Sequence, residues 1–93
     1  MDNSVHITVS KFLRPHTAGT ATAEVHASTV REALEAFFHQ FPEMRSRILL
    51  ANDDREVRRF VHVYLNGKEV RSPSELDRHI NGGDELILNP DVA

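Results

Sequence analysis

The sequence predicts an α+β fold in which one main helix packs across one face of a four- to five-stranded mixed sheet. Three features predict it. Short segments of alternating apolar and polar residues occur near both ends of the chain, one longer stretch repeats its apolar residues with helical spacing, and an Asn-Gly pair joins two further strand-like segments. The 93 residues are the size of one domain, and we expect residues 1–93 to fold as a single unit.

The N-terminal part of the chain predicts a β-hairpin. In residues 4–10, three β-branched apolar residues alternate with polar ones, which is typical of a half-buried strand. Pro15 and Gly19 indicate a turn after it. Residues 20–27 are predicted as a second, weaker strand, because their alanines offer little surface to pack. The short connection makes the two strands a hairpin.

The clearest element is a helix that begins after Thr29. Thr29 precedes Glu32 by three residues, the spacing of a capping box, in which each side chain accepts a hydrogen bond from the other residue's backbone N–H. Pro42 ends the helix, because the residue before a proline disfavours the α region. A single apolar stripe runs along it, formed by Val30, Ala33, Leu34, Phe37, Phe38 and Phe41. Three phenylalanines on one stripe need a broad, flat partner, and a sheet provides one.

A second hairpin is predicted in the second half of the chain. Residues 60–65 alternate as a strand, and Asn66 and Gly67 follow directly. Asn-Gly suits a type I′ turn, which needs positive φ at both central residues. Residues 68–71 are therefore the return strand.

A short helical turn and a last strand close the chain. Residues 72–75 repeat the capping pattern, with Pro73 at the first helical position. Residues 85–89 alternate as a strand, residues 90–93 are expected to form a flexible tail, and residues 43–59 show no regular pattern. The first and last strands are the most apolar, so we place them side by side in the middle of the sheet. This is the β-grasp (ubiquitin-like) arrangement.

Composition and charge exclude several classes of function. The absence of cysteine rules out a disulfide framework, a thiolate zinc site and a cysteine nucleophile. Eleven Lys and Arg against fourteen Asp and Glu give a net charge of -3, which disfavours a nucleic-acid partner. The apolar runs are far shorter than the ~20 residues that span a bilayer. Without a signal peptide, a cytoplasmic protein with no membrane partner is expected.

The histidines are not expected to bind a metal. None of them forms an i, i+4 pair, and no cysteine accompanies them. Solvent-facing positions explain them better, although the hairpin geometry would allow His6 to lie near His26. The six are His6, His16, His26, His39, His62 and His79.

No catalytic constellation is present, so the chain is not expected to be an enzyme. Its serines fit strands, caps and loops rather than a nucleophile elbow. Asp53, Asp54 and Glu56 lie among arginines, which is typical of a solvated surface rather than an acid–base pair. Residues 55–59 are the one basic cluster, either a charged loop that keeps the next strand soluble or a docking patch for an acidic partner.

Four segments resemble the MoaD/ThiS family of ubiquitin-like sulfur carriers. They are FLRP at residues 12–15, STVREAL at 28–34, FVHVYLNG at 60–67 and NGGDELILNPDVA at 81–93. The first and third are most similar to the actinobacterial carrier that feeds a cysteine synthase. The resemblance runs nearly end to end, and it implies a carrier that partner enzymes act upon.

In that family the reactive group is the C-terminus itself. The terminal carboxylate is adenylated by an E1-like, ATP-using enzyme and converted to a thiocarboxylate. The sulfur then passes to an accepting enzyme, which is cysteine synthase-like or the large subunit of molybdopterin synthase. For this chain the resemblance implies no bound cofactor, ATP used by the activating partner, and a JAMM-type protease as a candidate for tail processing.

The resemblance also assigns functional residues. The sulfur-bearing tail is Pro90, Asp91, Val92 and Ala93. It stops where the family continues with Gly-Gly, and three explanations stay open: two residues are missing from the sequence, the tail is processed, or the protein kept only the docking fold. The partner-docking surface is expected at Ser10, Phe12, Arg14, Arg58, Arg59, Ile87 and Asn89.

The leading hypothesis is a sulfur carrier that serves the synthesis of cysteine or another sulfur-containing product. Two alternatives remain open, a small subunit of molybdopterin synthase and a ubiquitin-like binding or modifier domain without sulfur chemistry. The sheet face expected to carry His6, Thr8, Ser10, Ile87 and Asn89 is polar, whereas permanent interfaces are apolar. This favours a shuttling carrier over a permanent subunit.

Overall fold

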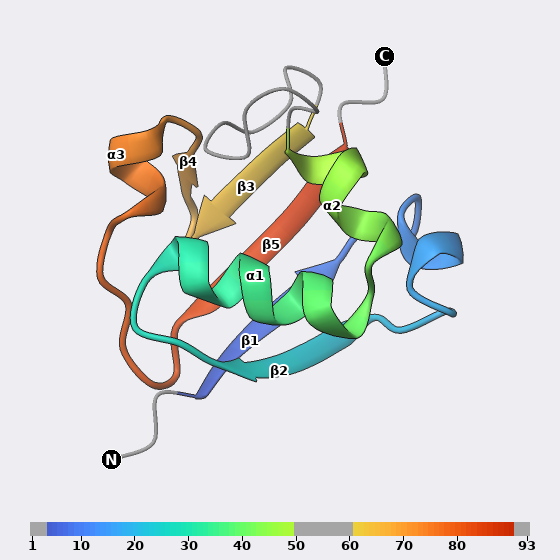
Figure 1. Cartoon of the computed structure of the whole chain (residues 1–93), viewed down its shortest axis with the longest axis horizontal. Coiled ribbons are helices and arrows are strands. Elements are labelled where there is room, and N and C mark those ends of the chain that lie inside the picture. The colour runs from blue at the N-terminus through green and yellow to red at the C-terminus, as the bar shows by residue number, and fades with distance from the viewer. Residues whose placement is uncertain (1–3, 50–60, 91–93) are drawn as a thin grey trace.

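The computed structural model, which describes residues 4–49 and 61–90, has a mixed sheet with helices on one face (Figure 1). The strands are β1 (Ser4–Val9), β2 (Thr22–His26), β3 (Val61–Leu65), β4 (Lys68–Val70) and β5 (Glu85–Pro90). The helices are α1 (Val30–Gln40), α2 (Glu43–Ile48) and α3 (Pro73–Leu76), with a 3₁₀ turn at Arg14–His16. The described helices are too short and too polar to cross a membrane.

The sheet order is β2-β1-β5-β3-β4, and β1 and β5 are parallel neighbours while the other neighbours are antiparallel. The predicted β-grasp fold is therefore confirmed, including the first and last strands side by side. Ile7 faces Leu86 and Val9 faces Leu88 across the parallel pair, and all four side chains are fully buried. They belong to one core cluster with the buried residues of α1, which lies across one face of the sheet (Figure 1), so the alternation in the sequence marks the core side of each strand.

Helix α1 starts and ends where the sequence predicts. The Thr29 hydroxyl accepts a hydrogen bond from the Glu32 N–H at 3.1 Å, and Phe41 follows the last helical residue, just before Pro42. One detail of the predicted capping box is wrong. The Glu32 carboxylate accepts from the N–H of Ser28 at 2.9 Å instead of from that of Thr29. The backbone of Thr29 is extended and bridges to residue 79, and this places the preceding N–H within reach.

The stripe on α1 is buried as expected, except that Phe41 at its end is only half-buried. Its ring still packs against Phe37, with ring centroids 5.3 Å apart. Helix α2 was not expected, because residues 43–59 were predicted to be irregular. Met44 and Ile48, four residues apart, are fully buried. Six residues are fewer than two turns, so the helical period repeats only once and gives a weak signal.

The second hairpin matches its prediction. Asn66 and Gly67 have φ values of 50° and 90°, as a type I′ turn requires, and they pair Leu65 with Lys68. Helix α3 has the predicted cap, since the Glu75 carboxylate accepts from the Ser72 N–H at 2.9 Å.

Pro90 corrects the predicted start of the tail. It was expected to be flexible, but it is the last residue of β5 and pairs with Val61. The Ser10 N–H donates to the Leu88 carbonyl at 3.0 Å, and the next bond of this parallel ladder would come from the N–H of residue 90. Proline has no N–H, so the ladder between β1 and β5 stops here. The Ser10 carbonyl instead accepts from the Leu13 N–H at 2.9 Å, which turns the chain away from the sheet.

Candidate functional site

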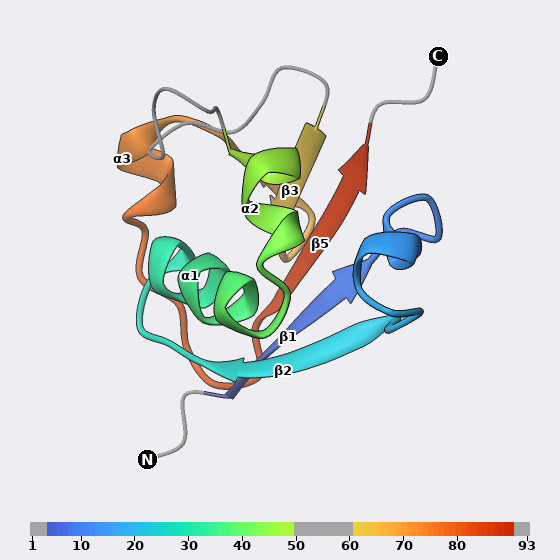
Figure 2. The same ribbon diagram turned by 45° about the vertical axis from the view of Figure 1, so that its right-hand side comes forward.

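The parallel strands β1 and β5 end at the same edge of the sheet, and the segment that follows β1 lies beside the end of β5 (Figure 2). We call this edge, formed by Ser10, His62, Asn89 and Pro90, the exit end. Asn89 pairs with His62 of β3, and Ser10 bonds to the residue before Asn89. The structure thus brings together two of the predicted docking residues and the first predicted tail residue.

The segment of residues 10–19 begins at the exit end and is held by its own internal contacts. Leu13 is buried, and the Arg14 Nε donates to the Val9 carbonyl at 3.2 Å. Thr17 is fully buried, with its hydroxyl 3.2 Å from the Arg14 carbonyl and 3.0 Å from that of Thr20. These contacts fix the backbone of a long connection, which is why it packs as a unit against the end of β1.

Phe12 stands out in this segment. Its side chain is 52% exposed, and it is the exposed large hydrophobic residue among those described. The Lys11 Nζ lies 5.4 Å from the centroid of its ring, within the range of a cation–π contact. Leu13, the next residue, points into the core instead. The predicted docking residue Phe12 is therefore accessible at the exit end.

The uncovered face of the sheet carries a half-buried strip that leads to the exit end. Thr8, Ile87 and Tyr64 lie in one row across β1, β5 and β3, and each is half-buried. Asn89 and His62 form the next row, which is part of the exit end itself. The predicted placement of Thr8, Ile87 and Asn89 on the face opposite the helices agrees with the structure. The strip offers a small apolar centre with a polar rim.

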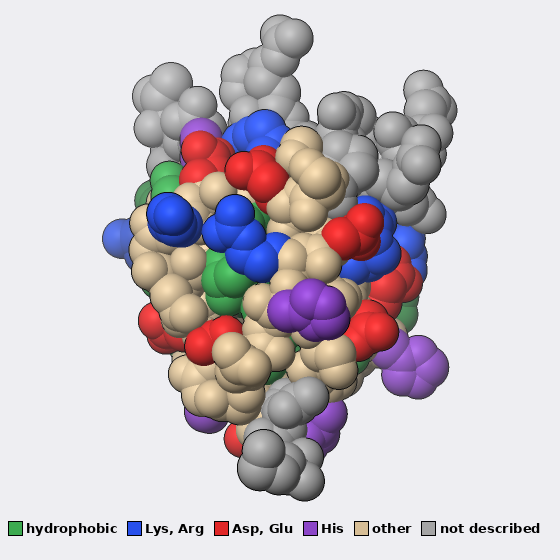
Figure 3. Space-filling model, turned by 90° about the vertical axis from the view of Figure 1, so that its left-hand side faces the viewer, with side chains coloured by type: hydrophobic (Ala, Val, Ile, Leu, Met, Phe, Trp, Pro, Cys, Tyr) green, Lys and Arg blue, Asp and Glu red, His purple; other side chains and the backbone are tan. Residues whose placement is uncertain are grey.

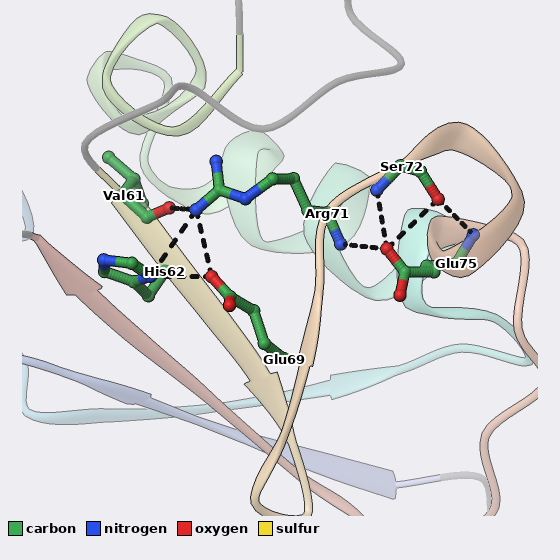
Figure 4. A network of polar contacts seen from close by, with 6 residues as sticks. All are labelled: Val61, His62, Glu69, Arg71, Ser72 and Glu75. Carbon is green, nitrogen blue, oxygen red and sulfur yellow. Dashed lines mark hydrogen bonds and ion pairs between the residues drawn. The ribbon is translucent and has the colours of Figure 1, made fainter.

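A polar network that was not predicted from the sequence includes His62 of the exit end (Figure 4). The Glu69 Oε2 lies 2.6 Å from the His62 Nδ1 and 3.0 Å from the Arg71 Nη2. Arg71 Nη2 also donates to the Val61 carbonyl at 2.7 Å. The hydrogen bond with His62, and then that from Arg71, lowers the pKa of Glu69 below its usual value of 4.5.

The same network continues into the cap of α3 (Figure 4). The Glu75 carboxylate accepts from the backbone N–H groups of Ser72 and Arg71, each at 2.9 Å. These bonds, with that of Ser72 the stronger influence, lower the pKa of Glu75. The type I′ turn was the sequence signal for the network. Counting outward from Asn66 and Gly67 places Tyr64 opposite Glu69 and brings residues 62 and 71 together.

Besides His62, two further histidines lie close to carboxylates. His6 Nε2 is 3.7 Å from a Glu24 oxygen, and His16 Nδ1 is 3.5 Å from one of Glu43. Glu24 is the residue opposite His6, whereas His26 lies opposite Ser4, so the arrangement considered for His6 and His26 does not put them face to face. Within residues 4–49 and 61–90, no group of three His, Asp or Glu side chains is arranged to hold a metal ion.

The side of the molecule that carries α3 and β4 differs from the exit end. Acidic and basic side chains are interspersed there, and hydrophobic side chains show only in small areas (Figure 3). The remaining predicted site residues, Arg58, Arg59, Asp91, Val92 and Ala93, lie outside the described residues, as does the rest of the basic cluster and the acidic residues beside it.

No protein-family model matches the chain. It is similar to the sulfur carrier protein CysO of Mycobacterium tuberculosis, with 26% identity over 90 residues that cover 97% of both proteins. It is also similar in structure to a chain of the Amycolatopsis orientalis BexX/CysO complex, with a TM-score of 0.81, 25% identity, and 96% and 97% of the two chains covered. A third similar structure is SAMP1, the small archaeal modifier protein 1 of Haloferax volcanii, with a TM-score of 0.79, 29% identity and 97% of both chains covered.

These similarities confirm the resemblance that the sequence carries. They extend over almost the whole chain, and they include the CysO group that the sequence analysis singled out. The relatives are small ubiquitin-like carriers and modifiers rather than enzymes, in agreement with the expectation that this chain is not an enzyme.

Proposed function

We propose that this chain is a sulfur carrier whose C-terminus is activated by adenylation and then bears the sulfur as a thiocarboxylate. The observation that carries the proposal is its similarity to CysO, which covers 97% of both proteins. The product served is cysteine or another sulfur-containing compound. The chain binds no cofactor itself, acts in the cytoplasm, and relies on ATP bound by its activating partner.

The chemistry requires two steps at one carbon atom. The terminal carboxylate attacks the α-phosphorus of ATP, which forms an acyl adenylate and releases pyrophosphate. A hydrosulfide equivalent from a sulfur donor then attacks the acyl carbon and displaces AMP, which leaves the thiocarboxylate. Partner enzymes supply the catalytic groups for both steps. The carrier has to supply a terminus that reaches their active sites and a surface that they bind.

The geometry of the exit end suits this task. Pro90 has no N–H with which to continue the ladder between β1 and β5, so that ladder ends beside the start of the terminal segment. Docking residues Ser10, Phe12, Arg14, Ile87 and Asn89 lie on or beside this end, with Arg58 and Arg59 as the further members of the surface. A half-buried strip with a polar rim is typical of transient interfaces.

We assign three kinds of partner to this surface. They are an E1-like adenylating enzyme, a sulfur-accepting enzyme that is cysteine synthase-like, and a JAMM-type protease for tail processing. The large subunit of molybdopterin synthase is the alternative acceptor, and the polar rim of the strip weighs against so permanent a complex.

A second candidate function is that of a protein modifier, joined through its C-terminus to other proteins. Its support is the similarity to SAMP1, at 29% identity and nearly full coverage. The two functions share the adenylation step. They differ in the nucleophile that attacks the acyl group, which is sulfur in a carrier and a lysine amine in a modifier.

The decisive experiment is the intact mass of the untagged protein purified from its own cells, before and after treatment with iodoacetamide. The sequence contains no cysteine, so alkylation reports a terminal sulfur without background from thiols. A fraction in which sulfur replaces one oxygen, and which iodoacetamide alkylates once, is expected. Protein made without the adenylating enzyme is the control.

Conjugates to lysines of other proteins, without a sulfur-bearing form, would favour the modifier. Absence of both species in the presence of the adenylating enzyme would overturn the adenylation step that the two candidates share.

A further inference from the structure

Phe12 is exposed on an ordered platform, not on a loose loop. Its N–H lies 3.4 Å from the Ser10 hydroxyl, and its neighbour Leu13 is buried and bonds back to the Ser10 carbonyl. Thr17 closes the same segment with its buried hydroxyl. A ring held on a fixed backbone loses little conformational freedom on binding, which is the property of an aromatic anchor.

Two basic residues, Lys11 and Arg14, stand on either side of Phe12 in the sequence. In the described part of the chain, neither Lys11 nor Arg14 forms an ion pair, whereas Arg71 contacts Glu69 and Arg31 contacts Asp77. The Lys11 Nζ lies over the Phe12 ring, and the side chain of Arg14, two residues further along the chain, is fixed by its bond to the Val9 carbonyl. On a chain with a net charge of -3, this is a local cationic site with an apolar centre.

We propose that Phe12, flanked by Lys11 and Arg14, is the anchor by which the chain docks on its adenylating enzyme, and that the matching surface there is an apolar pocket rimmed by carboxylates. The inference rests on the proposed function, because it names the partner of the exit end. A free carboxylate is common to every protein terminus, so an activating enzyme has to recognise the fold that carries it. The accepting enzyme meets a thiocarboxylate, which is distinctive in itself.

The anchor is also well placed for this step. Phe12 lies two residues after Ser10, whose N–H bonds to β5 next to the last residues of that strand. The segment of residues 10–19 and the end of β5 are neighbours in space (Figure 2). A partner that holds the ring is therefore beside the point from which the terminus must be led to ATP.

The test is ATP–pyrophosphate exchange by the adenylating enzyme of the same organism, with the carrier in its natural length as the varied substrate. Phe12→Ala is expected to raise the KM for the carrier about 30-fold with kcat unchanged, the size typical of an aromatic hot spot. Phe12→Leu should restore most of the affinity, because it keeps an apolar side chain. Lys11→Ala should raise KM about threefold and weaken its dependence on salt.

The matched control is Lys68→Ala. Lys68 is exposed beside the turn at the opposite end of the sheet, and its loss should leave KM and the salt dependence unchanged. A wild-type KM for Phe12→Ala, or a change confined to kcat, would overturn the anchor while leaving the carrier function intact. No exchange with the wild-type chain would overturn the proposed function and the anchor with it. Thermal unfolding of each variant checks that the exposed substitutions leave the fold unchanged.

Discussion

The connection between β1 and β2 spans residues 10–21, whereas β3 and β4 are joined by only two residues, Asn66 and Gly67. The short turn sets the register of its hairpin through positive φ values alone. The long connection needs buried side chains of its own, Leu13 and Thr17, to hold its shape. These buried side chains allow the long connection to keep Phe12 exposed beside the exit end. In this protein the turn that only reverses the chain is minimal, and the one with a surface to present has its own small core.

The largest expected effect on stability comes from a comparison of Leu13→Ala with Phe12→Ala. Leu13 is buried, so its truncation should lower the free energy of unfolding by about 3 kcal/mol, within the usual range for Leu→Ala in a core. Phe12 is half exposed, so its truncation should cost less than about 0.5 kcal/mol. Equilibrium unfolding in urea, followed by circular dichroism, measures both. Similar losses for the two variants would mean that the segment of residues 10–19 does not pack as described.

A smaller effect is expected in the short turn. Gly67→Ala should cost about 1 kcal/mol, because an alanine resists the positive φ of 90° that the turn requires. A Cβ there would meet no atom within 4 Å, so the cost is backbone strain without a clash. Lys68→Ala, at the next residue, should leave the same urea midpoint almost unchanged. No loss for Gly67→Ala would contradict the type I′ turn, and a loss near that of Leu13→Ala would mean that the substitution also disrupts the pairing of β3 with β4.

The contrast between the hairpins also explains what the sequence could predict. Strand alternation, the stripe on α1 and the Asn66-Gly67 turn are local patterns that one side-chain period or one dihedral preference determines, and each was predicted correctly. Helix α2 was missed, because Met44 and Ile48 supply a single helical repeat. The end of β5 was misplaced, because a proline is compatible with a strand end when the neighbouring ladder stops there.

The candidate site was predictable in part for the same reason. Ile87 and Asn89 follow from the phase of β5, and the network of His62, Glu69 and Arg71 could have been found by counting from the turn. The orientation of Phe12 could not. Phe12 and Leu13 are adjacent apolar residues in a segment without a period, and only the fold decides which of them is buried.

The smallest expected effect is a pH dependence that distinguishes the second hairpin from the first. His62 and Arg71 lower the pKa of Glu69 in the folded protein, so the folded state binds a proton less readily than the unfolded chain. The stability that this carboxylate contributes is therefore complete above its unfolded pKa, near 4.5, and is lost as the pH falls through the lower folded value. Glu69→Gln should flatten the decline in the free energy of unfolding below pH 4.5, measured by urea unfolding across a pH series.

Glu24→Gln in β2 is the matched control. Glu24 also faces a histidine, but at 3.7 Å and with both side chains more than half exposed, so that variant should keep the wild-type slope. If Glu69→Gln kept the full decline as well, the contacts of Glu69 with His62 and Arg71 would not contribute to stability in solution.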